Sequence, residues 1–281
     1  MSAVAARLDD GRLHLQHGPI DLVIEAFGAA DEIERAYGQA VDRFGDILPV
    51  LVGELSLLRR PLTEAYPLLQ GPVARRMAEA VWPYRTVFIT PMAAVAGAVA
   101  DEMLQALVRG RTLAKAYVND GGDIAIHLAP GQSLRAGIFA RALDGVALLT
   151  HERPVRGIAT SGWGGRSFSR GIADSATVLA ATAAAADAAA TMIANAVNAE
   201  HPSVERRPAH SLDPDSDLGE LPVTVAVGAL PPEIVDAALD RGLAEARRLR
   251  LRGLIDSAAL SVQGQWRLET GGTPLALSEA G

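Results

Sequence analysis

Asp187 and Thr191 are the residues of this sequence best placed to bind a metal ion. They are four apart in ATAAAADAAATMIANAVN, so a helix here puts both on one face, with Asn195 one turn further. A carboxylate beside a hydroxyl supplies the hard oxygen donors that Mg²⁺ prefers. The alternative is a polar stripe facing solvent. The alanine surroundings argue against it, because no Lys, Glu or Arg occurs between Ser175 and Ala199.

The second candidate is the glycine-containing segment Asn119-Asp120-Gly121-Gly122-Asp123, which lies between two predicted strands. Glycines leave backbone N–H groups uncovered, and such groups bind phosphate oxygens. The alternative is a plain hairpin turn, because Asn, Asp and Gly are the favoured turn residues. The residues by themselves leave both interpretations open.

The third candidate is the segment Ala159-Thr160-Ser161-Gly162-Trp163-Gly164-Gly165-Arg166-Ser167. It combines hydroxyl groups, uncovered amides, an arginine and one aromatic ring, a set that would suit a nucleotide diphosphate. It is not a P-loop, because no Gly-Lys-Ser/Thr follows at the required spacing. A mobile glycine loop without a ligand is the alternative interpretation.

Other catalytic patterns are missing from the sequence. The six histidines form no helical metal-binding pair, and neither a Gly-x-Ser-x-Gly elbow nor a Rossmann fingerprint occurs. Zero cysteines exclude disulfides, thiolate nucleophiles, iron–sulfur clusters and thiolate zinc sites. We interpret Arg247, Arg248, Arg250 and Arg252 as a solvated basic helix end.

The composition narrows the class of protein. The 281 residues include 26 basic and 33 acidic side chains, and the net charge of −7 argues against binding to nucleic acid or anionic membranes. The 49% of hydrophobic residues suffice for a core, and the 4% of aromatics predict thin, closely packed layers. We see no signal-peptide pattern, and the longest apolar run, Phe88–Ala100, is too short to span a bilayer. We therefore expect a soluble, cytoplasmic protein.

The elements that must position these segments follow from apolar spacing and turn residues. Helices are predicted over Ala30–Phe44, Arg75–Trp82, Thr90–Val108, Thr182–Asn198 and Pro231–Leu251. Strands are predicted over Arg12–Gln16, Asp21–Glu25 and Tyr84–Ile89, on both sides of the turn 119–122, and over Leu134–Phe139, Val146–Thr150, Ala173–Ala180, Leu221–Val227, Gly253–Val262 and Gln265–Leu268. The proline-containing region 49–72 is predicted as less regular, residues 200–220 as a loop of low order, and residues 270–281 as a frayed tail.

Strands that come in adjacent pairs favour an α+β fold over a regular βαβ alternation. We expect one domain, with an N-terminal α/β portion (1–83), a motif-bearing core (84–200), a C-terminal portion (201–269) and the tail (270–281). Small residues crowd the predicted helix start Thr90–Ala98. Either this helix lines the same cavity as Gly121-Gly122 and Asp187, or it packs tightly on a sheet.

Taken in order, the three segments resemble the ApbE-like superfamily, whose characterised enzymes are FAD:protein FMN transferases. The resemblance covers about residues 84–200. It implies a nucleotide site that includes Asn119, Gly121, Gly122, Asp123, Thr160, Ser161 and Gly162. It also implies that Asp187 and Thr191 ligate Mg²⁺ beside the pyrophosphate.

The sequence is more similar to an uncharacterised branch of that superfamily, through Pro91–Ala98, the Gly-Gly-Asp turn and Gly165–Ser169. Two features depart from the transferases. Their Lys-Gly-x-Ala-x-Asp helix reads here Ala96-Gly97-Ala98-Val99-Ala100-Asp101, without the lysine. Their His-x-x-Asp-Pro segment, with a catalytic histidine, has no counterpart in Arg156–Asp174.

The expected function is binding of a flavin nucleotide, FAD or FMN, or a similar diphosphate, together with Mg²⁺. An enzyme of this kind would transfer FMN to an acceptor protein or cleave the pyrophosphate. The alternative is a non-catalytic accessory or carrier protein, which the resemblance to this branch links to sulfur assimilation. The residues that would act catalytically, the acceptor and the oligomeric state are not indicated by the sequence.

Overall fold

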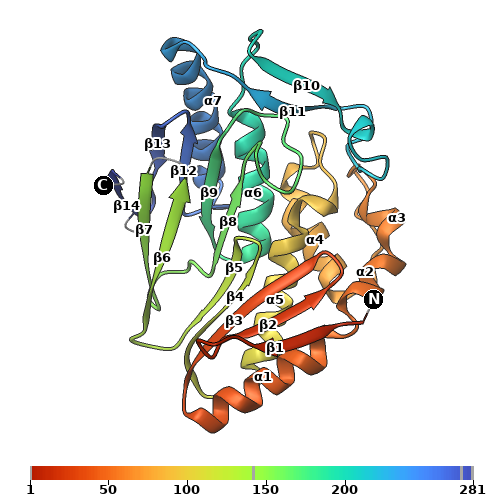
Figure 1. The fold of residues 1–281 in the computed structure, drawn as a ribbon, viewed down its shortest axis with the longest axis vertical. Helices are drawn as coiled ribbons and strands as arrows, with labels where there is room; N and C mark the ends of the chain where they lie inside the picture. The colour runs from red at the N-terminus through yellow and green to blue at the C-terminus, as the bar shows by residue number, and fades with distance from the viewer. Residues whose placement is uncertain (1, 141–142, 273–274, 280–281) are drawn as a thin grey trace.

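A nine-stranded sheet extends through the computed structural model, which describes residues 2–140, 143–272 and 275–279 (Figure 1). Every neighbouring pair of strands in it is antiparallel. In spatial order the strands are β1 (Val4–Arg7), β2 (Leu13–His17), β3 (Ile20–Gly28), β4 (Leu113–Asp120), β5 (Asp123–Leu128), β8 (Gly157–Ser161), β9 (Ser175–Ala180), β12 (Ser257–Val262) and β13 (Gln265–Glu269).

Two smaller sheets complete the strands. One contains β14 (Leu275–Glu279), β7 (Leu143–Thr150) and β6 (Ser133–Ala140), in that order, and the other pairs β10 (Val204–Pro208) with β11 (Pro222–Val227). Apolar residues of β6 and β7, such as Ala136 and Leu149, pack against Ile126, Ile158 and Leu179 of the large sheet. This packing gives the large sheet a second covered face.

The helices supply the main core. They are α1 (Ala30–Phe44), α2 (Ile47–Gly53), α3 (Leu55–Leu58), α4 (Pro72–Val81), α5 (Val95–Val108), α6 (Ala183–Ala196) and α7 (Pro232–Leu251), with 3₁₀ turns η1 (Trp82–Tyr84), η2 (Pro91–Ala94) and η3 (Ala209–Ser211). Helix α5 packs on β4 and β5, α6 on β8 and β9, and α7 on β12 and β13 (Figure 1). Helices beside antiparallel sheets confirm the α+β fold class.

Close contact between α5 and α6 is possible because both helices are rich in alanine. Asp101 of α5 accepts hydrogen bonds from the backbone N–H groups of Ala183 and Ala184 at 3.0 and 2.9 Å. Thr182 caps the same end by accepting from Ala185 N at 3.1 Å. The start of α6, and with it the position of Asp187, is therefore fixed by local capping and by α5.

The predicted strand Tyr84–Ile89 is wrong. The chain there forms η1 up to Tyr84 and continues as a turn and bend, and Val87 is exposed. Pro83 within η1 favours this helical turn. In the described part of the chain, no strand pairs with residues 84–89, so the segment is not part of a sheet. The β-branched and aromatic residues of this segment have high strand propensity, but propensity alone does not form a strand when no partner strand is adjacent.

Four other predictions need correction. The loop predicted over residues 200–220 contains β10 and η3, because β10 pairs with β11. Helix α2 overlaps the region 49–72 predicted as less regular, and α3 lies inside it; Pro49 falls in the first turn of α2, where proline is tolerated. The tail is not frayed throughout, because β14 pairs with β7 over residues 275–279. The basic end of α7 is not simply solvated: Arg250 Nε and Arg247 Nε lie 2.5 and 3.5 Å from the buried carboxylate of Glu269.

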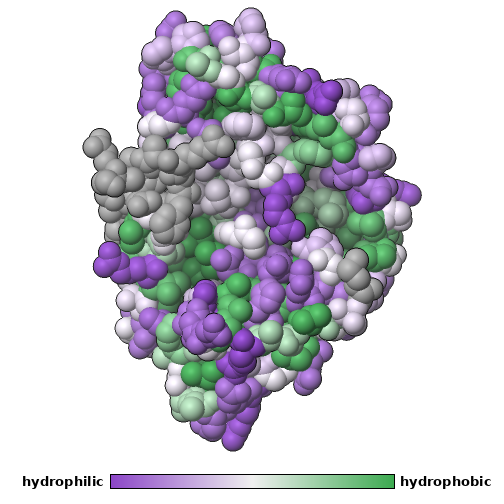
Figure 2. Space-filling model, in the orientation of Figure 1, coloured by the Kyte–Doolittle hydropathy of each residue, from purple (hydrophilic) through white to green (hydrophobic). Residues whose placement is uncertain are grey.

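Surface polarity is mixed. On the face shown in Figure 2, hydrophobic residues are interspersed with hydrophilic ones.

In the described part of the chain, the stretch Pro91–Val108 is long and apolar enough to cross a membrane, and half of it is buried in the fold. Core helices of globular proteins meet the same criterion, so this stretch is weak evidence for a membrane span.

Candidate functional site

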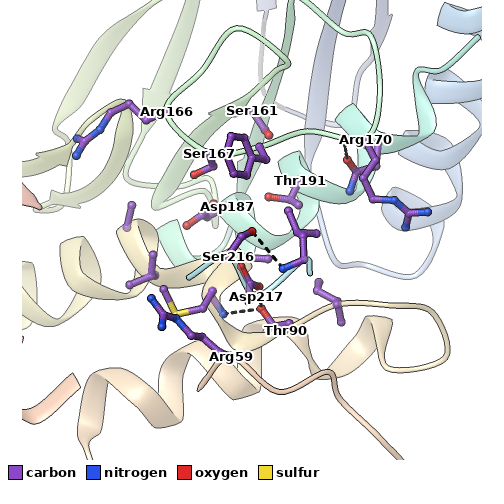
Figure 3. A pocket seen from close by; sticks show the side chains of 18 of the residues that line it. Arg59, Thr90, Ser161, Arg166, Ser167, Arg170, Asp187, Thr191, Ser216 and Asp217 are labelled. Atoms are coloured by element: carbon purple, nitrogen blue, oxygen red, sulfur yellow. Dashed lines mark hydrogen bonds between the residues drawn. The ribbon is translucent and has the colours of Figure 1, made fainter. Parts of the chain in front are cut away.

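A cavity of about 330 Å³ opens between the start of α5, helix α6 and two loops. Figure 3 shows Asp187 and Thr191 of α6 facing it, with Ser161 and Ser167 on one side and Ser216 and Asp217 on the other. The full lining is Arg59, Phe88, Ile89, Thr90, Met92, Ala93, Val95, Ala96, Asp123, Ser161, Arg166, Ser167, Phe168, Arg170, Asp187, Thr191, Met192, Asn195, Asp213, Asp215, Ser216, Asp217 and Leu218.

The structure places the two predicted metal ligands together. Asp187 and Thr191 are one turn apart on α6, and both line the cavity. The backbone N–H of Gly97 donates a hydrogen bond to Asp187 Oδ2 at 3.1 Å, which orients the carboxylate. Asn195, the third residue of the predicted stripe, also lines the cavity, but its Oδ1 already accepts from Arg170 N at 2.9 Å. The stripe thus faces a cavity and not open solvent.

The predicted nucleotide residues are split by the fold. Asp123 and Ser161 line the cavity; Asn119, Gly121, Gly122, Thr160 and Gly162 are outside its lining. Asn119 Oδ1 accepts from Gly122 N at 2.8 Å, so that amide is engaged within the turn itself. A Cβ on Gly162 would lie 2.4 Å from the carbonyl oxygen of Asp174, which makes this glycine a packing requirement.

The turn between β4 and β5 requires glycine for its backbone. Gly121 and Gly122 have φ values of +64° and +114°, and they join the paired residues Asp120 and Asp123. Two-residue hairpins of this kind favour Gly at positive φ. The hairpin interpretation therefore accounts for both glycines, and the turn brings Asp120 and Asp123 opposite each other.

Three carboxyl groups repel one another at this point. Burial is the main cause that raises the pKa of Asp187 well above its ordinary value, and the charges of Asp123 and Asp120 add to it. The Asp187 side chain is partly buried and lines the cavity. Burial likewise raises the pKa of Asp123, with a contribution from Asp120, against a hydrogen bond from Thr160 N. Burial raises the pKa of Asp120 to about 7, although Arg166 and a backbone hydrogen bond lower it.

The carboxyl groups do not by themselves make a complete metal site. Among the residues that the structure describes, no group of three or more His, Cys, Asp or Glu side chains is arranged to hold a metal ion. Asp187 and Thr191 offer two oxygen donors on one face. A Mg²⁺ ion has six ligands, so the remainder would have to come from water and from the oxygens of a ligand.

The other wall of the cavity comes from a segment that the sequence did not single out. Asp213, Asp215, Ser216, Asp217 and Leu218, which follow η3, are all part of the lining. The Asp217 carboxylate accepts a hydrogen bond from the Thr90 hydroxyl, and Asp215 Oδ1 lies 3.8 Å from Arg59 Nη1. The alternating acidic residues of Asp-Pro-Asp-Ser-Asp were visible in the sequence, but their position against Thr90 is a tertiary effect.

The small-residue helix start has two functions in the fold. Thr90, Met92, Ala93, Val95 and Ala96 line the cavity together with Asp187. Gly97 does not, since its Cα faces α6 and a Cβ there would lie 2.3 Å from the carbonyl oxygen of Ala183. The segment therefore lines a cavity with Asp187, as one interpretation predicted, but not with Gly121 and Gly122, and Gly97 follows the tight-packing interpretation.

Sequence comparison relates the chain to one protein family and to individual relatives. The chain matches the family described as AbpE bacteria over residues 5–268. The UPF0280 protein of Methanothermobacter thermautotrophicus is 38% identical over 143 residues, 49% of this chain and 54% of that protein. The UPF0280 protein of Methanosphaerula palustris is 36% identical over 201 residues, 66% of this chain and 78% of that protein. The chain spans about half the length of the first of these relatives.

Solved structures give a more distant likeness. The flavinyl transferase ApbE of Pseudomonas stutzeri, in apo form, is 12% identical, with a TM-score of 0.45 over 96% of this chain and 94% of that chain. The flavin transferase ApbE from Vibrio cholerae is also 12% identical, with a TM-score of 0.44 over 96% of this chain and 97% of that chain. The family match, in contrast, covers nearly the whole sequence. The protein belongs to the AbpE bacteria family, which confirms the resemblance that its motifs indicate.

Proposed function

We propose that this protein binds a flavin nucleotide, FAD or FMN, or a similar diphosphate, together with Mg²⁺ in the cavity. The observation that carries the proposal is that Asp187 and Thr191 lie one turn apart on α6 and face one cavity. The flavin itself comes from the motif resemblance and the family. A cytoplasmic location fits this function and stays part of the proposal.

The residues of the cavity fit such a ligand through their chemistry. Asp187 is held by Gly97 N–H beside the Thr191 hydroxyl, so both oxygens face the same space. Repulsion among Asp187, Asp123 and Asp120 would be relieved by a divalent cation. Mg²⁺, when bound, would neutralise charge on phosphoryl oxygens. The apolar side chains of Met92, Phe168 and Met192 add a surface for a ring system.

Two versions of this function differ in chemistry. An FMN transferase or pyrophosphatase needs a group that moves a proton. No histidine is among the described residues that line the cavity. Of the two serines in the relevant segment, Ser167 lines the cavity, whereas Ser169 is buried and hydrogen-bonded to Asn195 and to Gly171 N. This favours the accessory or carrier version, for which sulfur assimilation is the proposed context.

Calorimetric titration of Mg²⁺ with and without FAD tests the proposal. Wild-type protein should bind Mg²⁺ only when FAD is present, because two protein donors are too few to retain the ion. Asp187→Ala should abolish that binding, and Thr191→Ala should weaken it about tenfold through loss of one donor. Thr191→Ser keeps the hydroxyl and is the matched control. Equal binding by wild type and Asp187→Ala would refute the proposed site.

A further inference from the structure

A second recess lies on the helical side of the molecule and shares no lining residue with the cavity. It has a volume of about 600 Å³ and is formed by α1, α4 and α5. Four arginines and two glutamates border it, and its lining is Arg43, Pro72, Arg75, Arg76, Glu79, Glu102, Gln105 and Arg109. The lining holds two more basic than acidic side chains, and Asp46, which pairs with Arg43, offsets one of them, on a chain whose net charge is −7.

A buried carboxylate holds two of the arginines in place. The side chain of Glu102 is 8% exposed, and its oxygens lie 2.9 Å from Arg43 Nε and 3.3 Å from Arg76 Nε. Arg43 Nη1 also pairs with Asp46, and Arg76 Nη2 donates to Gln105 Oε1. Glu102 thus orients guanidinium groups from two different helices toward one recess. Because these two side chains are already held in place, they would lose little rotamer freedom on binding a ligand.

The other two arginines, Arg75 and Arg109, are exposed and form no ion pair within the described residues. Glu79 lines the same recess, one turn along α4 from Arg75. Arg75 precedes Arg76 in the first half of α4, a helix without an acidic residue in its first turn. The carboxylate of Glu54 accepts hydrogen bonds from Gln70 N and Gly71 N at 2.6 and 2.7 Å, so an anion of the chain itself lies at this positive end of the helix dipole.

We propose that this arginine recess binds a dianionic phosphoryl group, as inorganic phosphate or as a small phosphomonoester. Guanidinium groups bind phosphate oxygens through paired, charge-assisted hydrogen bonds. The several oxygens of a phosphoryl dianion can accept from arginines that lie on, or at the end of, three helices. A monocarboxylate would satisfy only part of this set.

The test is calorimetric titration of inorganic phosphate, and in parallel of glycerol 3-phosphate, in EDTA with chloride adjusted to constant ionic strength. EDTA removes the divalent ions that the cavity would use. Arg75→Ala and Arg109→Ala should each weaken binding of either probe about tenfold, because each removes charge-assisted hydrogen bonds. Both side chains are exposed, so near-ultraviolet circular dichroism should show an unchanged fold.

Two control variants locate the binding. Arg207→Ala removes an exposed arginine of β10, far along the chain from the recess, and Asp187→Ala alters the cavity. Both should bind phosphate as wild type does. Any of three results would overturn the proposal. Wild-type protein could show no saturable binding, Arg75→Ala and Arg109→Ala could bind with the affinity of wild type, or Asp187→Ala could lose binding.

Discussion

Asp120 illustrates how a single turn residue acquires unusual chemistry. The Gly121–Gly122 turn pairs Asp120 with Asp123 across the hairpin, and the Asp120 side chain is buried. Directly opposite like charges destabilise a strand pair, and burial removes the solvent that would screen them. The amide of Gly122 is engaged by Asn119, so the turn stabilises itself before any ligand binds.

The raised pKa of Asp120, about 7 against 3.8 for the ordinary side chain, predicts a pH-dependent stability. The native state holds the proton more tightly than the unfolded state, so this group destabilises the fold progressively as the pH rises from about 4 to about 7. Asp120→Asn stays neutral. It should therefore gain on the order of 2 kcal/mol over wild type between pH 5 and pH 8, in urea unfolding with EDTA.

The control for this prediction is Asp42→Asn, a substitution at an exposed position of α1. It should leave the difference from wild type the same at pH 5 and at pH 8. If Asp120→Asn also showed no change between the two pH values, Asp120 would not be a titrating group of the fold in this range.

At the scale of elements, the contact between α5 and α6 positions the cavity. Gly97 allows the two helices to approach until its Cα meets the backbone of Ala183, and its N–H then reaches Asp187. Asp101, one turn further along α5, caps α6 from the same side. The geometry of the proposed metal ligands thus depends on helix packing as much as on α6 itself.

Gly97→Ala should destabilise the protein by about 3 kcal/mol, because the added Cβ would lie 2.3 Å from the carbonyl oxygen of Ala183 and the helices would have to move apart. Chemical denaturation measures the change. Gly38→Ala is the matched control: Gly38 lies in α1 with no atom within 4 Å of a new Cβ. That substitution should be neutral or stabilise by up to about 1 kcal/mol. Similar stability of the two variants would contradict tight α5–α6 packing.

At the scale of the whole molecule, the large sheet joins every part of the sequence. Strand β3 from the N-terminal portion pairs with β4, and β12 from the C-terminal portion pairs with β9. The cavity consequently collects residues far apart in the chain, from Arg59 to Leu218. None of the portions 1–83, 84–200 and 201–269 completes the cavity alone, and a single domain stays a prediction.

From the residues that line the complete cavity, we expect poor transfer of flavin to an acceptor protein. After incubation with FAD, Mg²⁺ and a flavodoxin-type acceptor, the acceptor should stay unlabelled in a fluorescence gel. No histidine is among the described residues that line the cavity, and the Ser167 hydroxyl, like the other hydroxyls there, is a weak base near neutral pH. A flavin transferase assayed in parallel controls for the acceptor. Strong labelling that Asp187→Ala abolishes would instead establish transferase activity.

Local sequence patterns were sufficient for the helix that carries the two proposed metal ligands. Alanine-rich periodicity with Thr182 as cap predicts α6 and puts Asp187 and Thr191 on one face, as the structure has them. The Asn-Asp-Gly-Gly-Asp segment left a hairpin turn and a phosphate-binding loop open, and the structure shows the hairpin, in which both glycines adopt positive φ at little cost. In these cases neighbours within a few residues decide the conformation.

Tertiary structure alone decided what surrounds those elements. The wall of Asp213, Asp215 and Asp217 and the pairing of β14 with β7 depend on contacts between distant residues. Tyr84–Ile89 has strand propensity but no strand partner, because sheet formation needs a second segment and local preference does not supply one. The sequence by itself determined the helix of the candidate site, because its periodicity and cap are local, whereas long-range packing determined which residues share the cavity with Asp187 and Thr191.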